Sequence, residues 1–360
     1  MHTLAGVMDH GTGQPRRGAL RSLAFGAALA ARTAAQGADQ LIAPFAPKDR
    51  PGLLIFVFHC VFADQAEADS GVIDPHERAT CQGLARLIDY FRGHGYRFVG
   101  AREIDRGLEP DGRYAHLTFD DGFANNLQLI DLLAREEAHA TVFPSIGHVR
   151  QGSAFWWNVV YRERRRRGRG AVAAEYGKLR QMTVSEVNLY LLAEFGSRAL
   201  EPTGDIDRPL TPAELNELAS SPWIEIGNHT IDHAVLPSCG AEEAERQVDG
   251  AQRWLQETLG EAPFIISYPN GDATAETAKT AERLGLRLGV TVVPKRNRLP
   301  IGDPARMLLG RVRIVFGRRE RARMRALRSS VQIAAAARGL VLGRGEPDAP
   351  LSDGSGGAAD

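Results

Sequence analysis

The chain has 360 residues and a balanced formal charge, with 44 lysines and arginines against 44 aspartates and glutamates. At roughly 100–200 residues per domain, this length allows two or three small domains or one barrel with appendages. The neutral balance does not favour a polyanion-binding role, and a hydrophobic content of 43% excludes wholesale disorder. The sequence has no run of roughly 20 uncharged apolar residues for a spanning helix, and its three widely spaced cysteines exclude a disulfide scaffold.

The first 50 residues contain an alanine-rich apolar stretch that follows a group of arginines. We predict a helical arm over residues 1–50, because alanine has the highest helix propensity of all residues. The alternative is an atypical signal peptide, since Ala28-Leu29-Ala30 resembles a cleavage site. The arm predicts a cytoplasmic protein, and the signal peptide predicts an exported one.

Short apolar runs alternate with amphipathic helical patterns from residue 51 onward. The first run, 53–58, is apolar throughout and follows Pro and Gly, as expected of a strand buried on both faces. Repeated strand–helix units imply parallel strands with right-handed crossovers. We therefore predict an α/β fold, a distorted or incomplete (β/α) barrel of parallel strands over residues 51–317. Further strands are expected at 96–99, 115–119, 140–144, 224–227, 264–268, 288–293 and 311–316.

Three regions fall outside the strand–helix pattern: a basic insertion at about 150–210, a basic helix at 318–342 and a loose tail at 343–360. The arginine clusters at 162–169 and 318–328 fit solvated charged faces. The alternatives are contacts with an anionic glycan, a lipid-linked glycan or a membrane surface, which would make the protein peripherally membrane-associated. We predict no nucleic-acid binding, because the clusters lack interleaved aromatic residues and a recognised motif.

Polar residues follow the predicted strands at the rim where α/β barrels build their sites. His229 and His233 are four residues apart, and on a helical turn they would point the same way and share one metal. One carboxylate from another strand end would complete a face that leaves positions open for water and substrate. Asp120 and Asp121 are neighbours that would face opposite sides of a regular strand, so a turn at Gly122 would let them take two different roles.

Separated segments of the chain resemble, in order, the motifs of the polysaccharide deacetylases, which are the NodB-homology or carbohydrate esterase family four group. The resemblance covers residues 53–316. The segments are Thr118-Phe119-Asp120-Asp121-Gly122, Ala140-Thr141-Val142-Phe143, Gly227-Asn228-His229-Thr230-Ile231-Asp232-His233 and Ser267-Tyr268-Pro269-Asn270-Gly271.

This resemblance implies a role for each matching residue. Asp121, His229 and His233 would hold a divalent metal, most often Zn²⁺. Asp120 would be the general base that activates the hydrolytic water. Asn270 would offer its backbone N–H to the developing oxyanion, a kind of contact worth roughly 3–4 kcal/mol in the transition state.

The chain departs from the family pattern at two places. Many members have arginine where this chain has Ser267, and that arginine orients the catalytic aspartate. Arg311 and Arg313 on the last predicted strand are candidates to replace it, although solvated arginines at a strand end are the alternative.

The second departure is the missing carboxy-terminal Leu-x-His motif that supplies the general acid in many members. No histidine follows His233 in the sequence. His59 ends the first buried strand and resembles the signature of a branch whose catalytic domain is circularly permuted. We therefore predict that His59 protonates the departing amine.

The sequence thus predicts a metal-dependent hydrolase that removes N-acetyl groups from a hexosamine-containing glycan or glycolipid. One alternative is an amide hydrolase with a small non-sugar substrate. The other is a catalytically silent glycan-binding module. Trp156 and Trp157 would either stack on sugar rings beside the site or anchor the insertion in the core.

Overall fold

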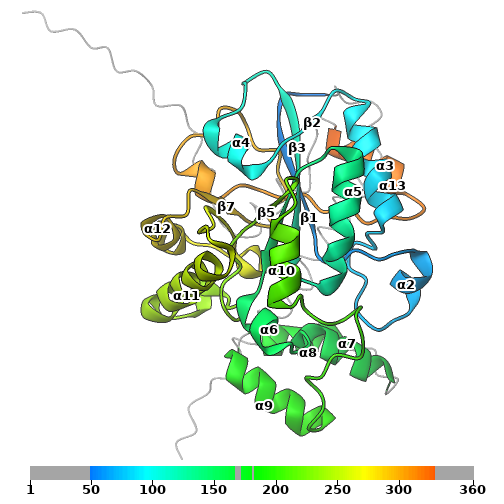
Figure 1. Ribbon diagram of the computed structural model, residues 1–360, viewed down its shortest axis with the longest axis vertical. Helices are drawn as coiled ribbons and strands as arrows, with labels where there is room; N and C mark the ends of the chain where they lie inside the picture. Colours follow the sequence, from blue (N-terminus) through cyan, green and yellow to red (C-terminus); the bar gives the residue numbers. More distant parts are fainter. Residues whose placement is uncertain (1–48, 167–171, 181, 329–360) are drawn as a thin grey trace, which may run out of the picture. The chain divides into compact units, whose positions relative to one another are not determined.

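The structure is a computed structural model that describes residues 49–166, 172–180 and 182–328 (Figure 1). The predictions for residues 1–48 and 329–360, which include the signal peptide and the tail, lie outside the described residues. The strands are β1 (Gly52–Phe58), β2 (Arg97–Phe98), β3 (Arg113–Asp121), β4 (Ala140–Pro144), β5 (Ile224–Ile226), β6 (Ile265–Ser267) and β7 (Leu288–Val290). The helices are α2 (Gln65–Asp69), α3 (Cys81–Arg92), α4 (Ala101–Arg106), α5 (Leu129–Glu136), α6 (Ile146–Gln151), α7 (Trp156–Arg166), α8 (Val172–Leu179), α9 (Val184–Phe195), α10 (Pro212–Ala219), α11 (Ala241–Leu259), α12 (Ala275–Arg283) and α13 (Glu320–Arg328).

All strand ladders are parallel. One sheet has the order β1-β3-β4-β5, and β2 pairs with the first part of β3 while β4 pairs with its last part. β6 and β7 form a second, two-stranded sheet. Isolated bridges connect the two sheets into a ring: Asn228 with Ile266, Val290 with Leu309, and Val312 with Phe56. The regular ladders do not complete this ring, so the prediction of a distorted or incomplete α/β barrel is confirmed.

The strand predicted at 311–316 is wrong except for one bridging residue. Val312 donates to the carbonyl of Ile55 and accepts from the N–H of Val57. The chain then leaves β1, because Phe316 donates to the carbonyl of Glu77 instead of continuing the ladder. The strand predicted at 288–293 likewise ends early, at Val290.

The two faces of β1 pack against different parts of the core. Leu54, Phe56 and Phe58 share an apolar cluster with the buried face of α3 and with α5 and α10, which lie on one side of the sheet (Figure 1). Leu53 and Ile55 pack in a second cluster, with residues of β6 and β7. Strand residues alternate between the two faces of the sheet. The second cluster therefore lies on the face opposite α3, in the interior of the ring.

α3 shows how local signals place the helices around the sheet. The hydroxyl of Thr80 accepts from the N–H of Gly83 and caps the first turn. Buried Leu84, Leu87, Ile88 and Phe91 follow at helical spacing.

The basic insertion forms α7, α8 and α9. Two of its arginines, Arg162 and Arg164, are buried. Arg162 is 4% exposed and donates to the Asp207 carboxylate at 2.6 Å. Arg164 pairs with Glu175 and Glu194. The prediction that this cluster is a solvated or ligand-contacting face is therefore wrong for Arg162 and Arg164, because carboxylates and carbonyls of the insertion itself take up their donors. Within the described part of the chain, no helix is both long and apolar enough to span a bilayer.

Candidate active site

β3 ends in the two adjacent aspartates, which lie at the rim of the ring. His116 and Thr118 precede Asp120 at strand spacing, and His116 is fully buried and contacts the carbonyl of Val99 and the hydroxyl of Thr141. Asp121 has a left-handed φ of 74°, and Gly122 follows with a φ of 80°. These two residues break the regular alternation of the strand, and Asp120 and Asp121 both lie within electrostatic reach of His59.

Arg311 holds Asp120 from across the ring. Its Nη1 and Nη2 donate to Oδ1 and Oδ2 of Asp120, both at 2.7 Å. The same guanidinium also contacts the hydroxyls of Thr118 and Ser267 and the carbonyl of Thr291. Arg311 is 1% exposed, so this two-pronged pair is shielded from water.

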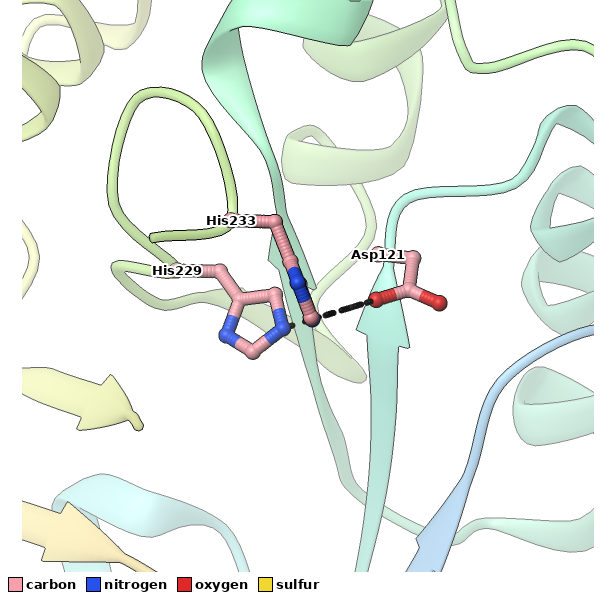
Figure 2. A group of neighbouring side chains, drawn as sticks. All are labelled: Asp121, His229 and His233. Atoms are coloured by element: carbon pink, nitrogen blue, oxygen red, sulfur yellow. Dashed lines mark ion pairs between the residues drawn. The ribbon is translucent and has the colours of Figure 1, made fainter. Parts of the chain in front are cut away.

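Three side chains, one from the end of β3 and two from the loop after β5, converge on one point (Figure 2). Nε2 of His229 and Nε2 of His233 each lie 3.5 Å from Oδ1 of Asp121. The three donor atoms all lie within 4.8 Å of one another. Nδ1 of His229 is 2.7 Å from the carbonyl oxygen of Ser267, which favours a tautomer that leaves Nε2 as the free ligand atom.

The residues fit a divalent metal, because buried donor atoms lack other partners. Oδ1 of Asp121 and Nε2 of His229 have no hydrogen-bond partner in the structure, and both atoms are buried. Such orphaned groups are costly unless a ligand satisfies them. Two imidazoles with one carboxylate form a common donor set for zinc in sites with open positions.

The electrostatics keep this donor set ready for a cation. Burial acts to raise the pKa of Asp121, but the neighbouring imidazole of His229 and the charges of His59 and His233 lower it well below its usual range. Burial lowers the pKa of His233 to about 3. Burial acts to raise the pKa of Asp120 as well, but the charges of Arg311 and His229 together lower it. At neutral pH the site thus offers ionised carboxylates and a neutral His233.

The histidine pair does not lie on a helix, and that expectation is wrong. Thr230 and His233 have left-handed φ values of 65° and 53°, and the residues between the histidines form a turn. The rings nevertheless lie 4.8 Å apart and converge on one point (Figure 2). The spacing of four residues therefore brings the two rings together through a turn and not through a helix.

His59 follows β1 and faces the same site. Nδ1 of His59 lies 3.0 Å from Oε2 of Glu77, which is 1% exposed. Burial would lower the pKa of His59, but the charge and hydrogen bond of Glu77 and the charges of Asp121 and Asp120 raise it to about 9. The side chain of Asn126, in the 3-10 turn after Asp121, donates to the carbonyl of His59 at 2.9 Å.

Arg313 is not paired with Asp120, unlike Arg311. Its Nε lies 3.0 Å from Oε1 of Glu77, so its partner is the carboxylate that holds His59. Burial acts to raise the pKa of Glu77, but the charges of His59 and Arg313 lower it to about 2. No motif in the sequence marks Glu77, since it lies in an irregular segment without periodicity.

The two tryptophans of the insertion take different positions. The ring of Trp157 is 8% exposed and lies 4.8 Å from that of His233. Trp156 packs edge-on against Tyr176 at 5.6 Å. Trp157 belongs to an apolar cluster that joins the insertion to residues outside it, such as Phe62 and Phe123, and Trp156 packs against this cluster, as the anchoring alternative expects.

The oxyanion candidate lies on the same rim. Asn270 has a left-handed φ of 56° within the turn Pro269–Gly271. This turn follows β6, whose last residue, Ser267, gives its carbonyl to His229 and its hydroxyl to Arg311. Its role in catalysis stays a prediction.

Comparisons with known proteins point to one family. A family model described as polysaccharide deacetylase matches residues 107–289. YxkH of Bacillus subtilis, curated as a candidate polysaccharide deacetylase, is 33% identical over 85 residues. That match spans 24% of this chain and 30% of the relative, so less than a third of the relative's length is covered.

Two solved structures share the fold. IcaB from Ammonifex degensii is 19% identical, with a TM-score of 0.50 over 79% of this chain and 97% of that one. A de-N-acetylase from Aggregatibacter actinomycetemcomitans is 14% identical, with a TM-score of 0.53 over 76% of this chain and 100% of that one. At these identities the likeness is one of fold.

Proposed function

Because the chain belongs to the polysaccharide deacetylase family, we propose that it is a metal-dependent hydrolase that removes N-acetyl groups from a hexosamine-containing glycan or glycolipid. Water and the amide would give acetate and a free amine. The observation that carries this proposal is the convergence of Asp121, His229 and His233, with orphaned donor atoms, beside an Asp120 that Arg311 holds ionised.

Asp121, His229 and His233 would hold the metal, and Zn²⁺ fits their donor set best. When bound, the metal would supply Lewis acidity to the substrate carbonyl and lower the pKa of a water molecule. Asp120 would accept the proton of the attacking water, since it is ionised and keeps lone pairs beyond those that Arg311 occupies. The bidentate pair fixes the direction in which the carboxylate points.

The backbone N–H of Asn270 would stabilise the oxyanion that forms when water adds to the carbonyl. His59 would then donate its proton to the nitrogen as the C–N bond breaks. A pKa raised to about 9 supports this role, because His59 stays protonated at neutral pH.

We expect Glu77→Gln to move the alkaline limb of the kcat/KM profile to lower pH by about one unit or more. The groups facing His59 are Glu77, His76, Asp120 and Asp121, and Glu77 contributes the largest upward effect on its pKa. Without that carboxylate, burial lowers the His59 pKa, so the acid form is lost earlier as pH rises. Acetate release measured between pH 5 and 10 tests this shift.

Glu320→Gln is the matched control, since Glu320 pairs with Arg86 on the exposed side of α3. This variant should keep the wild-type profile. If Glu77→Gln also keeps it, His59 is not the acid that Glu77 sustains.

Two other functions are distinguished by their products. Purified full-length protein with Zn²⁺ would be incubated with N-acetylglucosamine oligomers, acetylated glycolipids and small acetamides, and acetate would be measured. We expect release from the oligomers or glycolipids and none above background from the acetamides. Release from acetamides alone would favour a small-amide hydrolase, and glycan binding without acetate release would favour a silent binding module.

A further inference from the structure

The turn between the two histidine ligands needs support from outside itself. Thr230 and His233 both adopt left-handed backbone angles, which non-glycine residues rarely do without surrounding contacts that hold them. Because His229 and His233 flank this turn, the separation of their ring nitrogens depends on its shape.

The side chain of Gln247, on α11, forms hydrogen bonds with one side of this turn. Its Oε1 accepts from the backbone N–H of Ile231 at 3.1 Å and of Asp232 at 2.9 Å. Its Nε2 donates to Oδ2 of Asp232 at 2.8 Å and to Oε1 of Glu243 at 3.0 Å. Gln247 is 2% exposed, and these four contacts use the full bonding capacity of a side-chain amide.

Residues at the start of α6 hold the other side of the turn. Gly147 donates its N–H to the carbonyl of Ile231 at 2.6 Å, and the hydroxyl of Ser145 donates to the same carbonyl at 3.2 Å. The N–H of Ser145 donates to the carbonyl of Asp121 at 3.0 Å. Ser145 therefore links the end of β3, which carries Asp121, to the turn between the two histidines.

We propose that Gln247 is a positioning residue for the metal site: its amide holds the 230–232 turn against Ser145 and Gly147, and so sets the affinity for a divalent cation. This inference rests on the proposed metal-dependent function. Gln247 acts through the backbone of Ile231 and Asp232 and does not contact the three donor atoms itself. Groups that orient metal ligands in this way are typically worth 10–100-fold in affinity.

Two variants separate the amide's polarity from its bulk. Gln247→Leu keeps the volume but leaves the N–H of Asp232 and its carboxylate without their partner. Gln247→Glu keeps the acceptor but brings a third carboxylate to Asp232 and Glu243. The double variant Gln247→Glu with Asp232→Asn reverses the polarity of that contact, because the new amide at 232 can donate to the new carboxylate at 247.

Val248→Ala is the matched control on the same helix. Val248 is fully buried in an apolar cluster, so its truncation loosens α11 without removing any side-chain hydrogen bond. Full-length proteins would be freed of metal with a chelator. The Kd for Zn²⁺ would then be measured by competition with a chromophoric chelator, together with the Tm of each metal-free protein.

We expect Gln247→Leu and Gln247→Glu to weaken Zn²⁺ binding about 10–100-fold. Val248→Ala should bind as the wild type does, and the double variant should regain part of the lost affinity, because the repulsion from Asp232 is removed while that from Glu243 remains. With saturating Zn²⁺, Gln247→Leu should recover a kcat close to that of the wild type. This recovery shows that the residue acts on metal retention.

The proposal is overturned if Gln247→Leu binds Zn²⁺ as tightly as the wild type, or if Val248→Ala loses as much affinity. Should Gln247→Leu fail to fold, the single and double Gln247→Glu variants decide, since an absent rescue also contradicts the clamp. Wild-type protein that binds Zn²⁺ tightly but releases no acetate would refute the deacetylase function and leave the clamp standing. Wild-type protein that binds no divalent metal would refute both.

Discussion

Replacing Arg311 with methionine is expected to lower kcat/KM about 10²–10³-fold and the free energy of unfolding by about 3–5 kcal/mol. Arg311 is the bidentate partner of Asp120, and both side chains are buried. Methionine leaves that carboxylate without its counter-charge, so its pKa rises and its direction is no longer fixed. Acetate release and urea denaturation measure the two effects.

Arg328→Met is the control for stability alone. Arg328, at the end of α13, is also buried and pairs with Asp49 through two hydrogen bonds, so its partner is not Asp120. We expect it to lose stability and keep its turnover at low temperature. Equal loss of turnover in both variants would contradict a specific role for Arg311.

An exchange of positions provides a sharper test of the same contact. Nη2 of Arg311 lies 3.0 Å from the hydroxyl of Ser267, at the position where many family members carry the arginine. The double variant Ser267→Arg with Arg311→Ser should therefore recover part of the activity that Arg311→Ser loses. No recovery would show that the two positions cannot exchange the guanidinium.

Replacing Asp121 with asparagine is expected to reduce Zn²⁺ affinity by more than the roughly 10–100-fold that outer-shell changes cause, and to remove acetate release. The substitution keeps the shape but removes the only carboxylate of the donor set, whose Oδ1 lies 3.5 Å from both histidines. Metal competition and acetate assays on the same preparation measure both quantities.

Asp105→Asn makes the same change of charge elsewhere. Asp105 pairs with Arg287 and Arg306 at the end of α4. This variant should keep metal affinity and turnover. A wild-type Kd for Zn²⁺ in Asp121→Asn would show that the aspartate is not a ligand.

Local patterns predicted the strand ring well. The run at 53–58 is apolar because β1 is buried on both faces, and that signal survives in a single sequence. The segment 311–316 was predicted as a strand because its polar and apolar residues alternate, and this prediction is wrong. In the structure, only Val312 bridges β1, and the chain then turns so that Phe316 donates to the carbonyl of Glu77. Packing between distant segments determines this change of direction, and a local pattern does not show it.

The sequence predicted which residues form the candidate site, but it did not predict all the contacts between them. Asp120, Asp121, His229 and His233 carry a motif, and Arg311 was one of two candidates to orient the base. Arg313 could not be told from it, because both are arginines on one short segment.

The supporting residues could not be found from the sequence. Glu77 and Gln247 belong to no motif, and each matters only through long-range contacts with His59 or with the turn at 230–232. Arg162 shows the converse error. Its charge run suggested a surface, whereas Asp207 neutralises it inside the insertion.

The most direct test is a Zn²⁺ titration of the metal-free, full-length protein while acetate release from an N-acetylglucosamine oligomer is followed. The account predicts negligible release without metal, a linear rise, and a plateau at one equivalent of Zn²⁺ per chain, with no such rise in Asp121→Asn. Acetate released at the full rate by the metal-free protein, or an unchanged titration in Asp121→Asn, would contradict it.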